Sequence, residues 1–353
     1  MLKSDQKILL LELRNFGDAV ILTNLIESLS HSFKGIKIDL FTRPWFKEIF
    51  ENNPNINKII YAQFPFMRDK DLNPKTTMHL VMQILRLRMK RYDVCINNQG
   101  DFRENLIGCL INPKRNISVR WGIGHEFRNQ IRKNDWFNNK NESIGIPNDV
   151  INIYDINHYI MKKLGGTELL PPRVYLKNNP VKNGNLIAIH PMAGQACRLW
   201  SFEKWSGLIE KLIDKGYKID IFCAPDEKEL IIEKLYKIQR KDKVNMYAGR
   251  LDSFFEKLSQ ASLFIGLDSF SIHLAYALGI PGIMLNGAND YRIFLPKNAY
   301  VVLNKESCDK YPCYNKPSCQ GSLAEYHCIR GIQVNDVLEK VADWEKENKR
   351  KSP

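Results

Sequence analysis

The sequence predicts an α/β protein with two doubly wound parallel sheets, one in each half of the chain. Short apolar runs of the strand type alternate with segments whose apolar residues recur at helical spacing. The alternation stops at residues 171–184, which are rich in Pro, Lys and Asn, and then begins again. Several predicted strands end in polar turns, and open α/β sheets bind ligands at the carboxyl ends of their strands. Two such sheets imply a cleft between them, so we expect a ligand there.

In the first half, predicted strands and helices alternate up to residue 164. The strands cover residues 7–13, 36–41, 58–61, 94–96 and 117–121, and the helices residues 19–33, 44–50, 76–90, 104–110 and 149–164. Residues 62–75 and 122–148 are predicted to be loops. The second loop is polar and rich in Asn, and its length exceeds that of a simple connection, so we expect a functional flap or a mobile insertion.

In the second half, predicted strands cover residues 186–189, 218–222, 244–247, 263–265 and 281–285, and predicted helices residues 202–215, 227–238, 252–261, 272–278 and 335–349. The most informative stretch is 262–285, where a buried strand leads through the polar turn 268–271 into a helix that ends at Gly279. A strand, a tight turn and a helix N-terminus place backbone N–H groups and a positive dipole end at one point, which suits a phosphate. The same connection also occurs with a purely structural role.

These patterns predict four parts of the chain. An N-terminal Rossmann-like domain covers residues 1–170, a linker 171–184, a C-terminal Rossmann-like domain 185–334, and a charged terminal helix 335–353.

The composition is that of a soluble globular protein, with 44% apolar and 26% charged residues. The apolar runs are all shorter than the roughly 20 residues that span a bilayer. The first apolar segment is interrupted by Glu12 and Arg14, which is atypical of a signal peptide, so we expect a cytoplasmic protein. The formal charge of +13 indicates anionic partners such as nucleotides or an anionic membrane face, or else a solvated Lys-rich surface. Basic modules interleaved with aromatic residues are missing from the sequence, so we expect no nucleic-acid partner.

Three segments together resemble family 9 glycosyltransferases, the bacterial heptosyltransferase group. Residues 13–20, LRNFGDAV, match the opening R-x-x-x-G-D pattern with one residue fewer. Residues 189–191, IHP, followed by RLW at 198–200, are similar to the H-P-G-A loop and its following basic residue and Trp. Residues 266–275, GLDSFSIHLA, are similar to G-x-D-[ST]-G-x-x-H-L-A. Two departures are Met192 in place of Gly and Phe270-Ser271 in place of Gly-Pro. Because Phe adds bulk where Gly allows close backbone approach, the second departure bears on donor identity.

The resemblance implies the GT-B architecture, with acceptor bound by the N-terminal domain and sugar nucleotide by the C-terminal one. It implies an inverting transfer without a catalytic metal, in which a heptose moves from ADP-heptose to the inner core of lipopolysaccharide. Within this class, another nucleotide sugar or another acceptor, either a different glycan or a protein, stays open. From a different class, the chain could be a non-catalytic sugar-nucleotide-binding protein.

A single displacement needs a base for the acceptor hydroxyl and groups that hold the diphosphate as its charge grows. Asp18, after a Gly at the first strand-to-helix turn, is the candidate base, and its alternative role is a helix N-cap. Arg198 is the candidate diphosphate cation, because a guanidinium contacts two phosphate oxygens; its alternative is surface charge. His190 ends a strand, and a core role is favoured for it. The resemblance implies a donor site completed by Ala193, Gly194, Gln195, Glu227, Asp268, Ser269 and His273.

Within this site, the backbone N–H groups of 193–195 would face the phosphates and Glu227 would hold the nucleotide ribose. The alternative for Glu227 is a first-turn Glu favoured by the helix dipole. Asp268 could hold a sugar hydroxyl, and His273 could reach the diphosphate.

Of the eight cysteines, four are scattered and are expected to be small buried hydrophobes. The other four, Cys308, Cys313, Cys319 and Cys328, gather in the segment 308–328. Their spacing lacks the C-x-x-C pairs of ordinary zinc ribbons, so two interpretations remain open: a structural Zn or Fe site, or free thiols packed in a loop.

The basic helix 76–91 and the loop 122–148 suit an anionic glycolipid acceptor carrying acidic sugars or phosphate. Such an acceptor would keep the enzyme in peripheral contact with the inner face of the cytoplasmic membrane without a spanning segment.

Overall fold

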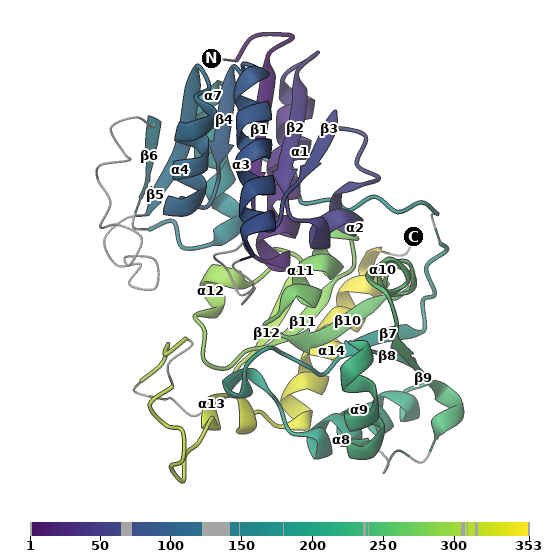
Figure 1. Cartoon of the computed structure of the whole chain (residues 1–353). Coiled ribbons are helices and arrows are strands. Elements are labelled where there is room, and N and C mark those ends of the chain that lie inside the picture. Colours follow the sequence, from purple (N-terminus) through teal and green to yellow (C-terminus); the bar gives the residue numbers. More distant parts are fainter. Residues whose placement is uncertain are drawn as a thin grey trace. The chain divides into compact units, whose positions relative to one another are not determined.

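A computed structural model of the chain describes residues 2–64, 73–121, 142–147, 149–178, 180–235, 238, 240–304, 308, 310–314 and 317–351. The chain divides into two compact units, Met1–Tyr175 and Leu176–Pro353 (Figure 1). The division falls inside the segment 171–184 that the sequence analysis treats as a linker.

The N-terminal unit is a parallel six-stranded sheet with the order β3-β2-β1-β4-β5-β6. Its strands are β1 (Lys7–Glu12), β2 (Lys37–Thr42), β3 (Lys58–Tyr61), β4 (Val94–Asn97), β5 (Arg115–Trp121) and β6 (Glu142–Ile146). Its helices are α1 (Phe16–Ser32), η1 (Pro44–Phe46), α2 (Lys47–Phe50), α3 (Pro74–Met89), α4 (Phe102–Ile111), η2 (Ile153–Asp155) and α7 (Ile156–Leu164).

The C-terminal unit repeats this plan, with a parallel sheet of order β12-β11-β10-β7-β8-β9. Its strands are β7 (Leu186–His190), β8 (Lys218–Cys223), β9 (Val244–Ala248), β10 (Leu263–Leu267), β11 (Gly282–Leu285) and β12 (Ala299–Val302). Its helices are η3 (Ala196–Arg198), α8 (Phe202–Asp214), η4 (Pro225–Glu227), α9 (Lys228–Lys234), η5 (Lys241–Lys243), α10 (Leu251–Leu258), α11 (Phe270–Ala277), α12 (Tyr291–Phe294), α13 (His327–Arg330) and α14 (Val334–Lys351).

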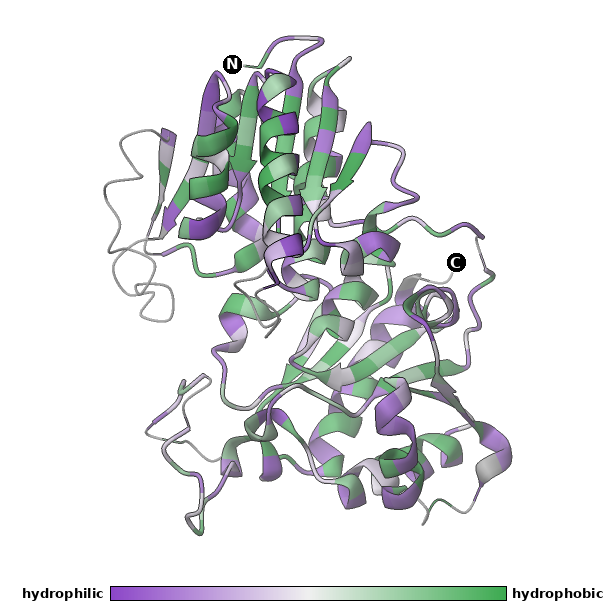
Figure 2. Cartoon of the chain, in the orientation of Figure 1, coloured by the Kyte–Doolittle hydropathy of each residue, from purple (hydrophilic) through white to green (hydrophobic). Residues whose placement is uncertain are grey.

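Burial explains why the central strands were predictable. The side chains of β10 are buried along its whole length, and residues 8–11 of β1 are fully buried. Strands covered on both faces carry continuous apolar runs, and these runs are what the sequence shows. Figure 2 shows the apolar residues concentrated in the strands.

In the N-terminal unit, α3 packs beside α4 and α1 beside α7. Leu80 and Ile84 of α3 share an apolar cluster with Leu9 and Leu11 of β1, so the buried stripe of α3 covers one face of the sheet. The two-domain α/β prediction is confirmed.

Several element predictions were wrong in detail. Residues 122–148 were expected to be a loop, but residues 142–146 form β6, which pairs with β5. Its sequence, ESIGI, is short and contains Gly, so its apolar alternation is weak. Residues 122–141, on which the predicted flap depends, lie outside the described residues. The helix expected at 149–164 begins later, because the Asn152 side chain accepts from the Tyr154 N–H and caps the short helix η2.

The prediction missed β12, α12 and α13, which are each only four residues long. Among the described residues, none of the helices has the length and hydropathy needed to cross a bilayer.

Candidate active site

Both sheets reverse their strand order at one point, between β1 and β4 in the N-terminal unit and between β7 and β10 in the C-terminal unit. In open α/β sheets the loops that leave the carboxyl ends of these strands diverge to opposite faces, and ligands bind between them. The predicted site residues of each unit lie in loops at or next to its reversal point.

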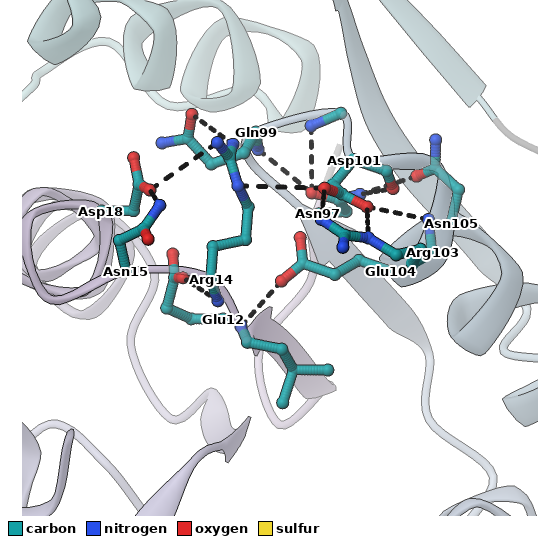
Figure 3. A network of polar contacts seen from close by, with 12 residues as sticks. Glu12, Arg14, Asn15, Asp18, Asn97, Gln99, Asp101, Arg103, Glu104 and Asn105 are labelled. Atoms are coloured by element: carbon teal, nitrogen blue, oxygen red, sulfur yellow. Dashed lines mark hydrogen bonds and ion pairs between the residues drawn. The ribbon is translucent and has the colours of Figure 1, made fainter. Parts of the chain in front are cut away.

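Asp18 lies in the first turn of α1 and is 9% exposed. Asn15, and not Asp18, holds the N-cap position, so the alternative that Asp18 caps the helix is wrong. The Asp18 carboxylate accepts a hydrogen bond from Asn15 Nδ2 at 2.9 Å and lies 3.8 Å from Arg14 Nη2 (Figure 3). One amide and one guanidinium therefore hold the carboxylate in place.

Arg14 links this carboxylate to the loop after β4 (Figure 3). Its Nη1 donates to Gln99 Oε1 at 3.4 Å, and its Nε lies 3.9 Å from Asp101 Oδ2. Burial lowers the pKa of Arg14, but the carboxyl groups of Asp18, Glu104, Glu12 and Asp101 more than offset this and raise it overall. The guanidinium therefore stays charged beside Asp18 at every physiological pH.

Glu12 and Glu104 are buried behind Arg14. Glu104 Oε1 accepts from the Leu13 N–H at 2.7 Å, and Glu12 Oε1 from the Arg14 N–H at 3.0 Å. Burial, with a smaller contribution from Asp101, raises the pKa of Glu104 to about 8. Burial and the neighbouring Glu104 also raise the pKa of Glu12. Glu104 is thus largely protonated at pH 7, which reduces the negative charge gathered around one arginine.

A tight turn after β4 positions Gln99 and Asp101. Asn97 Oδ1 accepts from the N–H groups of Gln99 and Gly100, at 3.1 and 3.0 Å. Gly100 has φ of +72°, and a Cβ there would lie 2.3 Å from the Val119 carbonyl oxygen, so only Gly fits. Sequence reasoning missed this loop. Its signal was the polar run NNQGD between a strand and a helix, the same signal that singled out Asp18.

In the C-terminal unit, three neighbouring strands place the predicted donor residues at one sheet edge. Strand β7 lies between β10 and β8, with His190 opposite Gly266. The loop 191–198 follows β7, Asp268 and Ser269 follow β10, and the turn 224–227 follows β8. All three segments leave the carboxyl ends of parallel strands, so the structure brings them to one edge.

A direct contact joins two of these loops. Arg198 Nη1 donates to the backbone carbonyl of Asp268 at 3.3 Å, so this Arg is not a free surface charge. The Asp268 side chain is 4% exposed, and its Oδ2 accepts from Asn289 Nδ2 in the loop after β11. Asn289 was not predicted, because its link to Asp268 joins positions 21 residues apart.

Helix α11 begins beside this contact. Ser269 is its N-cap residue, and the Ser269 hydroxyl lies 2.8 Å from that of Ser271. His273 is buried within the same helix. The ring of Phe270 packs against Phe255 of α10, with centroids 6.1 Å apart. The Phe that departs from the family pattern thus contributes to packing between two helices.

The remaining predicted residues differ in their surroundings. Glu227 Oε2 accepts from the Ala224 N–H at 2.9 Å at the start of the helical turn. This contact fits the alternative in which Glu227 serves the helix N-terminus, and it occupies one of the two carboxylate oxygens. Gly194 is exposed, with open space where a Cβ would be, and it lies between the partly buried Ala193 and Gln195. Burial lowers the pKa of His190 to about 4, so its ring is neutral at pH 7.

The four C-terminal cysteines line one cavity of about 250 Å³, together with His327 and Tyr311. All four are free thiols. Among the residues that the structure describes, no three His, Cys, Asp or Glu side chains are arranged to hold a metal ion.

Comparisons with known proteins agree with this picture. The model of the family described as glycosyltransferase family 9 (heptosyltransferase) matches residues 82–324. Lipopolysaccharide heptosyltransferase 3 of Escherichia coli is 25% identical over 300 residues, which cover 80% of this chain and 84% of that protein.

Two solved structures share the fold. The family 9 glycosyl transferase of Veillonella parvula aligns with a TM-score of 0.76 at 16% identity, covering 97% of this chain and 98% of the other. The E. coli heptosyltransferase WaaC with ADP aligns with a TM-score of 0.74 at 17% identity, covering 96% and 99%. Since the family model spans well over half of the sequence, the chain belongs to glycosyltransferase family 9 and is a glycosyltransferase of the GT-B fold.

Proposed function

We propose that the protein transfers a heptose from ADP-heptose to the inner core of lipopolysaccharide, with inversion at the anomeric carbon. The curated relative at 25% identity is a lipopolysaccharide heptosyltransferase, which supports both the sugar and the acceptor. The N-terminal unit binds the acceptor and supplies the base, and the C-terminal unit binds the sugar nucleotide.

In the proposed reaction, Asp18 accepts the proton of the acceptor hydroxyl while that oxygen attacks the anomeric carbon of the heptose. The bond between this carbon and the diphosphate oxygen breaks, and ADP leaves with the bonding electrons. Arg14 supports this role, because its guanidinium lies 3.8 Å from the Asp18 carboxylate and, together with Asn15, fixes where that carboxylate lies. Asn15 holds one carboxylate oxygen, so the other is available to the acceptor.

The observation that carries the donor assignment is the Arg198–Asp268 contact at the reversal point of the second sheet. It places a guanidinium beside the N-terminus of α11, where backbone N–H groups and a positive dipole end favour a diphosphate. The exposed backbone at Gly194 adds further donors, and Asp268 and Glu227 offer acceptors to sugar hydroxyls. Arg198 and the helix terminus would stabilise the charge that grows on the leaving diphosphate. The proposed chemistry requires no metal ion.

Release of ADP from ADP-heptose in the presence of a heptose-free lipopolysaccharide core tests the proposal, with UDP- and GDP-sugars as matched donors. We expect turnover with ADP-heptose alone, unchanged by EDTA. Turnover with another nucleotide sugar would show that the proposed donor is wrong. Turnover only with a different glycan or a protein would show that the proposed acceptor is wrong. Binding of ADP-heptose without turnover on any acceptor would support a non-catalytic sugar-nucleotide-binding protein.

We also propose that the four C-terminal cysteines hold a structural Zn or Fe ion. Support comes from their position around one cavity, since soft thiolates select these metals. Because no three of the described side chains are arranged as metal ligands, binding would require the four cysteines to move closer together. Burial, helped by neighbouring thiols, raises the pKa of Cys328 to about 11, so metal binding would also release protons.

Elemental analysis of the purified protein tests this site. We expect about one equivalent of Zn or Fe, lost in Cys313→Ser/Cys319→Ser and kept in the control Cys109→Ser. Metal-free protein whose four thiols all react with a thiol reagent would show that they are packed free thiols.

The proposed acceptor also places the enzyme at the inner face of the cytoplasmic membrane.

A further inference from the structure

Helices α3 and α4 present an unusual exposed surface. Most of the large apolar side chains exposed in the described part of the chain lie on these two helices. We define the α3–α4 face as the exposed apolar residues Met78, Val81, Met82, Leu85 and Met89 of α3 and Phe102, Leu106 and Leu110 of α4, which are 37–74% exposed. Because α3 already buries Leu80, Ile84 and Leu87 against the sheet, this second apolar stripe has no role in the core of the unit.

The charges on the face are of one sign. Lys75, Arg86, Arg88 and Arg91 are exposed on or next to α3, and Arg88 Nη1 donates to the Leu110 carbonyl, which joins the two helices. The two helices contain a single carboxyl group, Glu104, and it is buried. A shallow groove along most of α3 is lined by both kinds of residue: Pro74, Lys75, Met78, His79, Met82 and Arg86.

This chemistry fits one occupant. Exposed apolar side chains set among cations, with no exposed carboxylate on either helix, are the features of helices that lie in the headgroup region of anionic bilayers. A second copy of the chain fits poorly, because each copy carries a formal charge of +13 and the face offers no acidic complement. The segment 122–141 of the same chain is also a poor occupant, because it carries more basic than acidic side chains.

We propose that the α3–α4 face docks the protein on the surface of an anionic lipid bilayer. The inference deepens the proposed function and rests on it in one respect: a glycolipid acceptor would be presented at that same surface. Met82, Leu85 and Met89 enter the headgroup boundary, while Lys75 and Arg86 contact lipid phosphates.

Sedimentation of the full-length protein with vesicles tests the proposal. Vesicles of phosphatidylglycerol and phosphatidylethanolamine should bind the protein, with an affinity that falls as salt rises, and pure phosphatidylcholine vesicles should not. Lys75→Gln/Arg86→Gln should weaken binding about 25-fold, at about five-fold per cation. Leu85→Glu/Met89→Glu should abolish it. The matched control is Leu230→Glu/Ile232→Glu on α9, which changes two similarly exposed apolar residues in the other unit and should bind as the unchanged protein does.

A far-ultraviolet circular dichroism spectrum and a melting temperature equal to those of the unchanged protein show that each variant is folded. Equal binding to both vesicle types, or loss of binding in the α9 control alone, would overturn the proposal. A dimer that the α3 variants dissociate, without any lipid binding, would assign the face to a second copy. If no nucleotide sugar is turned over while anionic vesicles still bind, the proposed function fails and the docking surface stands.

Discussion

Replacing Glu104 by Gln tests whether a buried carboxyl group behind Arg14 carries a proton. Gln has nearly the same shape and keeps an oxygen that can accept from the Leu13 N–H. It cannot ionise, so it removes the titration and little else.

The size of the change in the free energy of unfolding with pH follows from the pKa of Glu104. Burial raises the pKa of Glu104 to about 8 from its usual value of 4.5. Because the folded state holds this proton more tightly than the unfolded state, the group contributes stability at low pH that is lost as pH rises from about 4.5 to about 8. The slope is about 1.4 kcal/mol per pH unit while the group is fully protonated and half of that at pH 8, so the loss between pH 6 and pH 8 is about 2 kcal/mol in the native protein. In Glu104→Gln this loss should be absent.

The measurement is urea unfolding at pH 6 and pH 8, monitored by hydrogen exchange in peptides from β1 and β4. These peptides report the free energy of unfolding of the N-terminal unit separately from that of the C-terminal unit. The control is Asp149→Asn, an exposed carboxyl in the same unit, which should keep the pH dependence of the native protein. An equal pH dependence in native protein and Glu104→Gln would refute the reasoning, since Glu104 would then be ionised in the folded state at pH 6.

Two further substitutions test single contacts. Arg198→Gln should weaken ADP binding by about 10- to 100-fold in calorimetry, which is the usual cost of losing a charged hydrogen bond. The control Arg250→Gln changes an exposed arginine and should bind ADP as the native protein does. Equal ADP affinities in the two variants would show that Arg198 does not contact the diphosphate. Gly100→Ala should destabilise the N-terminal unit by about 3 kcal/mol or more, because its Cβ would clash with the Val119 carbonyl oxygen. The control Gly184→Ala places a Cβ in open space and should melt as the native protein does. A melting temperature unchanged in Gly100→Ala would show that the turn can relax.

The sequence predicted the two sheets because their central strands are buried on both faces. Strands such as β10 appear as uninterrupted apolar runs, and the polar residues that follow them mark the sheet edge. The edge strand β6 was missed, because a strand with one packed neighbour and a Gly at position 145 has little apolar pattern. The short strand β12 was missed as well.

The candidate site was predicted unevenly for a related reason. Asp18, Arg198 and Asp268 stand in local strand-turn-helix patterns, so their positions were visible. Asn289 and Glu104 act on Asp268 and Arg14 through contacts between distant parts of the chain. The role of Asn15 as N-cap in place of Asp18 depends on where α1 begins, and the boundaries of helices are weakly encoded in sequence.

The most direct test of the proposed reaction is the turnover of Asp18→Asn with ADP-heptose and a heptose-free core acceptor, measured together with ADP affinity. Loss of a general base should lower kcat by about 10²- to 10⁴-fold while ADP binds as it does to the native protein. A kcat within a few-fold of the native value would show that another group takes the proton and would contradict the role of Asp18.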